Sequence, residues 1–386
     1  MTLAVALVAI TTAVYAISAI GFLARLFKYF PPVVWLYFVP MLFSTAGILP
    51  SDHSLYGSVA KYALPMALLL LTISTDLRAI ASVGIPALLA LVAGAIGVGI
   101  GAITALLLLG TWLPDESWRT LTMLSASWIG GSANMVAMQQ SLNVEAQFVG
   151  PVVVVDTVVA YSWLGVLIAL SAYQPSINRF LQADESVLDQ VEERLKTAAE
   201  DVRPVTVRSI VIILGAALVT AFLARSFAET LPELGDPKII TATTWTILLA
   251  VTAGLLLSGS TLGRAARRHR ASEYAYAALF LLLVSVGAQA DLRAITGAPA
   301  FLLAGLLVLL VHFAVLVSTC RLLRLPAFFV AVGSMANIGG AVSGPISAAA
   351  YRPSLAPVGA LLGVAGYVLG IYLPLLLAFL LSSLAP

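Results

Sequence analysis

The chain has 386 residues, of which 61% are hydrophobic and 10% charged, and its mean hydropathy is +1.03. This composition is typical of a protein that lies in a lipid bilayer, so we expect a multi-pass protein of the inner (plasma) membrane. A net charge of +2 without a basic tract argues against a nucleic-acid partner, and a single cysteine excludes an internal disulfide and a thiolate metal cluster.

Twelve apolar segments follow one another along the chain, six on either side of a polar stretch. A window of about 19 residues, the length that spans a bilayer as a helix, detects them. They cover residues 2–24, 33–50, 57–74, 83–110, 117–143, 151–173, 206–224, 239–257, 274–289, 298–320, 326–350 and 357–381. The first 24 residues lack a basic start, so we expect a retained first span and not a cleaved signal.

The polar stretch at 174–205 separates the two halves. Leu188, Val191 and Leu195 fall on one helical stripe of this stretch. Its seven acidic residues are Asp184, Glu185, Asp189, Glu192, Glu193, Glu200 and Asp201. We expect an amphipathic, water-exposed cytoplasmic connector, either a plain tether or a regulatory or partner-binding arm. The domains would then be an N-terminal membrane repeat (1–173), the connector (174–205) and a C-terminal membrane repeat (206–386).

Short motifs recur in the same order in the two halves. The sequence Asp-Leu-Arg-Ala-Ile at 76–80 returns at 291–295. Upstream, Thr-Ala-Gly-Ile-Leu at 45–49 is answered by Thr-Ala-Gly-Leu-Leu at 252–256. A duplicated membrane unit is typical of secondary transporters, which hold their substrate where two internal repeats meet.

The repeated Asp-Leu-Arg motif precedes an apolar segment each time. Asp76 and Asp291 are suited to cap the N-termini of helices, with Arg78 and Arg293 reaching toward lipid headgroups. A gating ion pair is the alternative. An intramembrane aspartyl dyad is disfavoured, because inverted repeats would place the two carboxylates on opposite faces of the membrane.

Two of the apolar segments, 117–143 and 326–350, are interrupted by glycine and polar residues. The interruptions are Ser125, Ser127, Gly130, Gly131, Ser132 and Asn134 in the first, and Gly333, Ser334, Asn337, Gly339, Gly340, Ser343, Gly344 and Pro345 in the second. Glycine and proline weaken a helix, and bare backbone at membrane depth needs protein or a water-filled cavity around it. Each segment is either a broken spanning helix or a re-entrant hairpin.

The distribution of basic residues favours the re-entrant alternative. If both segments re-enter and both termini lie outside, five of the 20 lysines and arginines face outside, namely Lys61, Arg119, Arg225, Lys238 and Arg293. If every segment crosses, the better orientation leaves seven of the 20 outside. Positive residues concentrate on the cytoplasmic side, so the first arrangement fits better. Each half then has five true spans, and an odd number makes the two repeats inverted.

The paired halves, the soluble connector and a Gly-Gly/Asn segment before the last span of each half resemble the YjcL-like (DUF819) family of membrane proteins. The resemblance covers essentially the whole chain. The architecture is similar to that of sodium–glutamate symporters and, more distantly, of cation/proton antiporters and bile-acid sodium symporters. The resemblance implies ion-coupled solute transport across the inner membrane and does not indicate a substrate.

The interrupted segments form the candidate site for an ion and a solute. Unwinding a helix exposes carbonyl oxygens that coordinate cations and amide groups that favour anions. Ser132 and Asn134, with Ser334 and Asn337 as approximate counterparts, add side-chain oxygens suited to Na⁺. The alternative is that the glycines only allow close helix packing. The full set of candidate residues is Ser127, Gly130, Gly131, Ser132, Asn134, Asp156, Thr157, Ser334, Asn337, Gly339, Gly340 and Ser343.

Two ionisable residues stand inside predicted spans. Asp156 follows a run of four valines, and such carboxylates are costly in a membrane and are usually functional. It could help to bind a cation or relay a proton, or it could be paired structurally with a hydroxyl or backbone group. His312 is alone in an apolar span, where a packing role is the more common one.

These observations together predict an ion-coupled secondary transporter of a small organic anion, amino acid or short peptide. Na⁺ is the first choice of coupling ion, bound near Asn134 and Asn337. A proton-coupled carrier or antiporter that uses Asp156 is the alternative, and a channel is a further one. No metalloprotease, nucleophile-elbow or phosphate-loop motif occurs, so we expect neither an enzyme nor a cofactor. A homodimer is compatible with the sequence.

Overall fold

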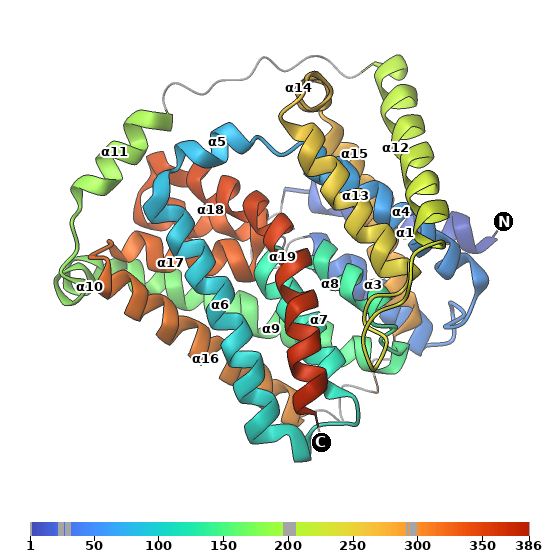
Figure 1. Cartoon of the computed structure of the whole chain (residues 1–386), viewed down its shortest axis with the longest axis horizontal. Coiled ribbons are helices and arrows are strands. Elements are labelled where there is room, and N and C mark those ends of the chain that lie inside the picture. The colour runs from blue at the N-terminus through green and yellow to red at the C-terminus, as the bar shows by residue number, and fades with distance from the viewer. Residues whose placement is uncertain are drawn as a thin grey trace. The chain divides into compact units, whose positions relative to one another are not determined.

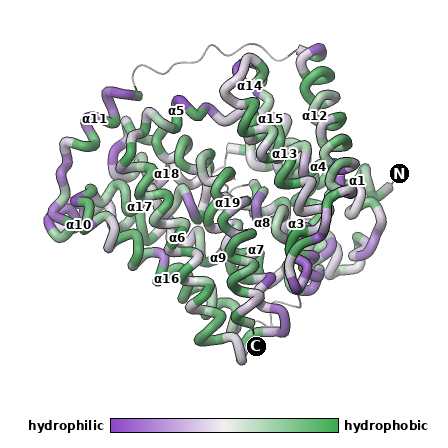
Figure 2. The backbone as a smooth tube through the Cα atoms, viewed as in Figure 1, coloured by the Kyte–Doolittle hydropathy of each residue, from purple (hydrophilic) through white to green (hydrophobic). Residues whose placement is uncertain are grey.

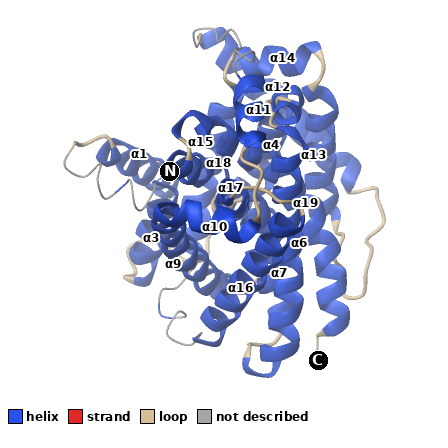
Figure 3. Ribbon diagram, turned by 90° about the vertical axis from the view of Figure 1, so that its left-hand side faces the viewer, coloured by secondary structure: helices blue, strands red, loops and turns tan. Residues whose placement is uncertain are grey.

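The fold is known from a computed structural model that describes residues 2–21, 27, 32–195, 206–290, 293 and 299–385. Within these residues the regular structure is helical apart from one isolated bridge between Leu234 and Ile240 (Figures 1 and 3). Each of the twelve predicted apolar segments contains helix. The all-α fold class is therefore confirmed.

Helices before the connector are α1 (Thr2–Ser18), α3 (Pro32–Thr45), α4 (Ser54–Ile73), α5 (Leu77–Ser82), α6 (Gly84–Leu109), α7 (Ser117–Gly130), α8 (Ser132–Ser141) and α9 (Ala146–Leu170). The connector contributes α10 (Gln174–Leu181) and α11 (Ser186–Leu195). Then follow α12 (Val207–Ala228), α13 (Ala242–Ser258), α14 (Thr261–Arg268), α15 (Ala271–Gln289), α16 (Pro299–Leu322), α17 (Ala327–Ile338), α18 (Gly340–Tyr351) and α19 (Ala356–Leu384).

Helix length and composition identify the candidate membrane spans. Among the described residues, seven helices are long and apolar enough to cross a bilayer, or eight if α13 and α14, which are bent by 94°, count as one span. Helices α1 and α3 have 17 and 14 residues, fewer than the ~20 that a span usually needs. The long helices consist mainly of hydrophobic residues, whereas hydrophilic residues are concentrated in the connector and the loops (Figure 2). Five spans per half and an inverted relation of the halves remain predictions.

The chain divides into two compact units. Unit 1 comprises Met1–Ser74, Gln139–Thr157 and Val202–Pro299, and unit 2 comprises Thr75–Met138, Val158–Asp201 and Ala300–Pro386. Each unit takes segments from both predicted repeats. The compact units are defined by contacts in space and the repeats by recurring sequence motifs, so the two divisions need not coincide. The repeat boundaries therefore also remain a prediction.

Unit 1 is built around α4, which contacts α12, α13, α14 and α15. Leucines of α4 and residues of α13 and α15, such as Val251 and Leu282, are buried in its core. Helix α12 is the exception: only 17% of its span is buried, and large apolar side chains such as Val211 and Leu223 are 64% and 60% exposed. Exposed apolar side chains on a spanning helix are suited to contact lipid.

Unit 2 is built around α19, which contacts α6, α7, α17 and α18. The close contacts depend on glycine. A Cβ atom on Gly359 would lie within 3 Å of the backbone of Gly344, and one on Gly101 would lie 2.8 Å from the backbone of Val308. Gly101 and Gly359 are therefore positions where a small residue allows two helices to pack closely.

The first part of the connector belongs to unit 2 and packs against its other helices. Leu188 and Val191 of α11 are each 2% exposed and join a hydrophobic cluster with Leu181 of α10 and Phe328 of α17, and Leu195 packs against it. The amphipathic stripe predicted from the sequence is thus confirmed. Up to residue 195 the connector is docked by its apolar face, whereas residues 196–205 lie outside the described part. The choice between a plain tether and a regulatory or partner-binding arm remains a prediction.

Candidate ion and solute site

Two helix breaks in unit 2 define the candidate site, and each contains a glycine in the left-handed region. Gly131, with φ of +83°, lies between α7 and α8. Gly340, with φ of +60°, begins α18 directly after Gly339 ends α17. This conformation is open to glycine at little cost and strains other residues. The interruptions predicted from glycine and polar residues are therefore confirmed as breaks.

The two breaks lie against each other, although about 200 residues separate them in the chain. A Cβ atom on Gly340 would be 3.9 Å from the Cα of Gly131. Gly366 of α19 lies beside both, because its Cβ would be 2.8 Å from the carbonyl oxygen of Ile129 and 3.5 Å from that of Ala336. The last turns of α7 and α17 therefore converge on one glycine of α19.

The α17–α18 pair begins and ends at the same end of unit 2. At its start, the backbone N–H of Ala327 donates to Asn178 Oδ1 of the connector at 2.8 Å. Just after its end, Arg352 donates to Asp189 and forms a second ion pair with Glu192, each at 2.7 Å. Both ends thus contact the same 15-residue stretch of connector. This course agrees with the re-entrant alternative, which remains a prediction.

Helix α7 approaches its break from the other end of unit 2. Helix α6 begins in the cluster beside the connector, where Val83 and Ala87 are buried. Its 26 residues rise ~39 Å, so the chain reaches the opposite end of the unit before α7 begins. The two broken segments therefore enter from opposite ends and meet at their breaks.

Fully buried side-chain oxygens without a hydrogen-bond partner lie on the two broken segments. Those within one turn of a break are Asn134 Oδ1, Asn337 Oδ1 and Ser343 Oγ, and Ser347 Oγ lies one turn further along α18. All four residues are 0% exposed. A buried acceptor without a partner costs about 1–3 kcal/mol, so each such atom calls for an explanation such as a bound ion or water.

The orientation of both asparagines follows from their neighbours. Asn134 Nδ2 donates to the carbonyl oxygen of Tyr367 at 3.0 Å. Asn337 Nδ2 donates to the carbonyl oxygens of Leu91 at 2.9 Å and Gly333 at 2.8 Å. Since all three partners can only accept, the nitrogens must face them and the oxygens must point elsewhere. The fold itself therefore holds two amide oxygens in place for a positively charged or hydrogen-donating group.

The left-handed glycines give a second correspondence between the two breaks. Aligning Gly131 with Gly340 superposes the Ile-Gly-Gly sequences at 129–131 and 338–340. Asn134 then corresponds to Ser343, three residues past each left-handed glycine. Ser132 and Asn134 follow their break, whereas Ser334 and Asn337, their approximate counterparts in the sequence interpretation, precede theirs. Both correspondences remain predictions.

Ser334 belongs to a saturated hydrogen-bond chain. Trp163 Nε1 donates to Ser334 Oγ at 2.9 Å, and Ser334 Oγ lies 2.9 Å from His312 Nε2. His312 Nδ1 is 2.8 Å from the carbonyl oxygen of Gly94, which can only accept. The neutral imidazole therefore donates through Nδ1 and accepts the Ser334 proton at Nε2. This favours the packing role for His312, and it commits the hydroxyl of Ser334 to His312.

Other predicted residues occupy distinct surroundings. Ser127 is buried in α7, its carbonyl oxygen accepts from Gly131 N–H at 2.6 Å, and Ser132 is half-buried at the start of α8. Gly130 packs against Gly366 and Gly370 of α19. The packing and binding interpretations of the glycines are thus compatible, because close packing is what brings the breaks together.

Asp156 and Thr157 belong to unit 1 and the breaks to unit 2. Half-buried Asp156 lies close enough to Tyr37 of α3 to act on its hydroxyl electrostatically, and that hydroxyl is buried without a hydrogen-bond partner. Thr157 is 7% exposed. The expectation that Asp156 stands near the breaks remains a prediction.

The capping prediction is confirmed for Asp76. Its Oδ1 accepts from the backbone N–H groups of Arg78 at 2.9 Å and Ala79 at 3.0 Å, at the start of α5. Arg78 and Arg293 are exposed. Asp291 lies outside the described residues, so its predicted role is not addressed.

Sequence analysis missed Trp163, Tyr367, Leu91 and Ser347. Tyr367 and Leu91 contribute only backbone carbonyl oxygens, which leave no signal in a sequence. Trp163 and Ser347 are residues of ordinary type in apolar helices, so only the fold shows what they touch. Among the described residues, no group of three or more His, Cys, Asp or Glu side chains is placed to hold a metal ion.

Comparison with known proteins places the chain in a family. The family model described as "Protein of unknown function (DUF819)" matches residues 6–384. The chain belongs to this family. It is also similar to the uncharacterized membrane protein YjcL of Bacillus subtilis (strain 168), with 26% identity over 343 residues that cover 86% of this chain and 85% of that protein. The DUF819 chain is thus a multi-pass membrane protein with transmembrane helices.

Proposed function

We propose that this chain is an ion-coupled secondary transporter that moves a small organic solute across the inner membrane. The observation that supports it most is the meeting of the two helix breaks, at Gly131 and Gly340, beside buried oxygens without partners. Secondary transporters bind substrate and coupling ion at discontinuous helices of this kind. The approach of α7 and α17 from opposite ends supports the inverted repeats on which alternating access depends.

Na⁺ is the coupling ion that the donors favour. Asn134, Asn337 and Ser343 offer neutral amide and hydroxyl oxygens, and the ends of α7 and α17 offer carbonyl oxygens. Unwound backbone carbonyls coordinate Na⁺ in transporters with broken helices. A bound ion would supply the partner that each buried oxygen otherwise lacks.

The solute is a small organic anion, amino acid or short peptide. Helices α8 and α18 start at the breaks, at Ser132 and Gly340, and the first N–H groups of a helix favour a carboxylate. The coupling ion and the carboxylate of the solute would then bind next to each other in one site, so the binding of one would raise the affinity for the other.

Thermal unfolding of the purified protein tests the ion site. We expect NaCl, compared with choline chloride at equal ionic strength, to raise the Tm, and one solute of a metabolite panel to raise it further only with Na⁺. Asn134→Ala and Asn337→Ala should abolish the Na⁺ shift. Asn178→Ala is the matched control, because it also removes a buried amide of unit 2 but acts at the connector.

Two outcomes would contradict the assignment. If both asparagine variants keep the full Na⁺ shift, the oxygens at the breaks do not bind the ion. If Na⁺ has no effect, while uptake into proteoliposomes follows a pH gradient and is lost in Asp156→Asn, the proton-coupled alternative holds. The proton-coupled alternative is supported by the position of Asp156 near Tyr37 in unit 1.

A further inference from the structure

Unit 1 contains a groove that is lined by none of the residues at the helix breaks. Its volume is about 580 Å³, and α4, α12, α13 and α14 contribute its walls. The residues that line it include Leu69, Ile73, Ile212, Leu257 and Leu262. Ile212 and Leu262 are 56% and 59% exposed, although both are large and apolar. The groove is therefore a mostly hydrocarbon surface that a hydrocarbon ligand would cover favourably.

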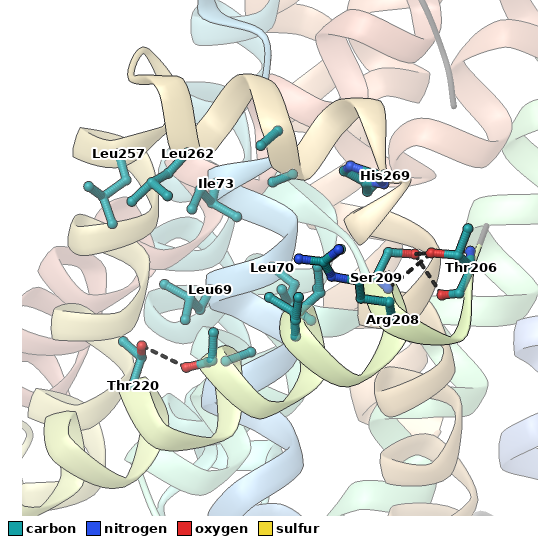
Figure 4. A pocket seen from close by; sticks show the side chains of 16 residues that line it. Leu69, Leu70, Ile73, Thr206, Arg208, Ser209, Thr220, Leu257, Leu262 and His269 are labelled. Atoms are coloured by element: carbon teal, nitrogen blue, oxygen red, sulfur yellow. Dashed lines mark hydrogen bonds between the residues drawn. The ribbon is translucent and has the colours of Figure 1, made fainter. Parts of the chain in front are cut away.

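One end of the groove is polar and basic. Figure 4 shows Arg208, Ser209, Thr206 and His269 at this end, opposite Leu257, Leu262 and Leu69. His269 Nδ1 is buried and has no hydrogen-bond partner. Thr206 and Ser209 bond to each other in a capping box at the start of α12, so they are already satisfied. Arg208 and His269 remain as groups for an anionic or hydrogen-bonding ligand.

Within the part of the chain that the structure describes, no carboxylate lines the groove, and helix α14 beside it is basic. Helix α14 begins at the Ser260 cap and carries Arg264, Arg267 and Arg268. Arg264 and Arg267 each donate to a backbone carbonyl oxygen of the α13–α14 turn, which restrains their side chains. A short amphipathic helix with basic residues, set at a sharp angle to a spanning helix, is suited to the headgroup region of a membrane.

The length of the groove matches one leaflet. Its lining runs along α12 from Arg208 to Thr220, twelve residues apart, which is ~18 Å of helix. Half the hydrocarbon core of a bilayer is ~15 Å thick. An acyl chain lying against α12 would therefore place its phosphate at the level of Arg208.

We propose that this groove binds an anionic phospholipid, with one acyl chain along α4 and α12 and the phosphate between Arg208 and His269. The basic end lies at the predicted cytoplasmic side, where anionic lipids attract juxtamembrane arginines. A carboxylate solute is the poorer occupant, because most of the groove is apolar. The lipid would fasten α12, the least buried spanning helix, to α4 and α13.

The test uses the full-length protein in neutral detergent with added dioleoylphosphatidylglycerol or dioleoylphosphatidylcholine. We expect the anionic lipid to raise the Tm by several degrees more than the zwitterionic one, and native mass spectrometry to show one retained anionic lipid. Arg208→Gln should weaken binding about fivefold, the effect of one basic residue near an anionic surface. Arg225→Gln is the matched control on the same helix and should leave binding unchanged.

Ala216→Phe separates the groove from general surface charge. Ala216 lines the groove, is exposed, and bears no charge. Filling the groove at this position should reduce the retained lipid while all basic residues remain. The proposal is wrong if both lipids stabilise the protein equally, if Arg208→Gln and Arg225→Gln behave alike, or if Ala216→Phe retains the lipid in full.

Discussion

Ser334 of α17 and Ser343 of α18 stand nine residues apart on either side of one helix break, and both are 0% exposed. Ser334 is the middle of a chain from Trp163 to His312 and on to Gly94, with every donor and acceptor matched. Ser343 has no partner for its hydroxyl. The two serines are therefore equally buried, but only the hydroxyl of Ser334 is hydrogen-bonded.

This difference distinguishes polar side chains that hold the fold of a membrane protein together from those that can bind a ligand. Saturated polar groups hold helices together, because breaking any link leaves a buried group unpaired. Unsaturated groups reduce stability until a ligand supplies the missing partner. Polarity in a span therefore indicates a binding site only where the fold leaves the polar atom unmatched.

Gly366→Ala should have the largest effect, because it disturbs both regions at once. A Cβ at this position would meet the carbonyl oxygen of Ile129 at 2.8 Å and force the two breaks apart. We expect a loss of ~3 kcal/mol in the free energy of unfolding and loss of the Na⁺ response. Denaturant unfolding with and without Na⁺ measures both. Gly99→Ala, where nothing lies within 4 Å, is the control and should be neutral or slightly stabilising.

Ser334→Ala should come next and affect stability only. It leaves Trp163 Nε1 and His312 Nε2 unpaired in the protein interior, which costs about 2 kcal/mol. The Na⁺-dependent shift in Tm should persist. If Ser334→Ala abolishes the shift while the protein remains folded, Ser334 binds the ion and the contrast with Ser343 is wrong.

Ser343→Ala should give the reverse pattern. Removing an unpartnered buried hydroxyl should leave the free energy of unfolding without Na⁺ unchanged or raise it, by up to the ~1–3 kcal/mol that such a group costs. The apparent Kd for Na⁺ should rise about tenfold, the loss of ~1.4 kcal/mol expected for one oxygen ligand. Titration of the Tm with Na⁺ checks this. An unchanged Kd would remove Ser343 from the proposed site.

Arg352→Gln should have the smallest effect. Its guanidinium, 31% exposed, pairs with Asp189 and Glu192 of α11. Hydrogen bonding to Asp189 raises the pKa of Arg352, with Glu192 adding to the effect, so the charge persists as pH rises and only salt weakens the pair. We expect a loss below ~1 kcal/mol at low salt, vanishing at high salt, and faster hydrogen exchange in α11. Exchange unchanged in α11 would mean that its apolar face alone holds the connector.

The sequence by itself determined that the protein lies in a membrane, that it is helical, and where two of its apolar segments are broken. The hydrophobic composition indicates that the chain lies in a bilayer. Long apolar segments form helices there, because the backbone N–H and C=O groups have no water to hydrogen-bond with and must pair within the segment. Left-handed positions at Gly131 and Gly340 could be anticipated, since glycine tolerates them. The stripe of Leu188 and Val191 predicted an amphipathic helix through the helical period alone, and only the structure shows that its apolar face is docked.

Only the tertiary structure decided which polar atoms are matched. Ser334 and Ser343 look alike in sequence, yet the hydroxyl of Ser334 bonds to His312 and Trp163 and that of Ser343 has no hydrogen-bond partner. The bonds of Ser334 join helices that are far apart in the chain, so the sequence does not show them. Carbonyl oxygens of Leu91 and Tyr367, which orient the two asparagines, are present in every residue and so carry no sequence signal. Hydrogen bonding is directional and short in range, so it is fixed by coordinates and not by composition.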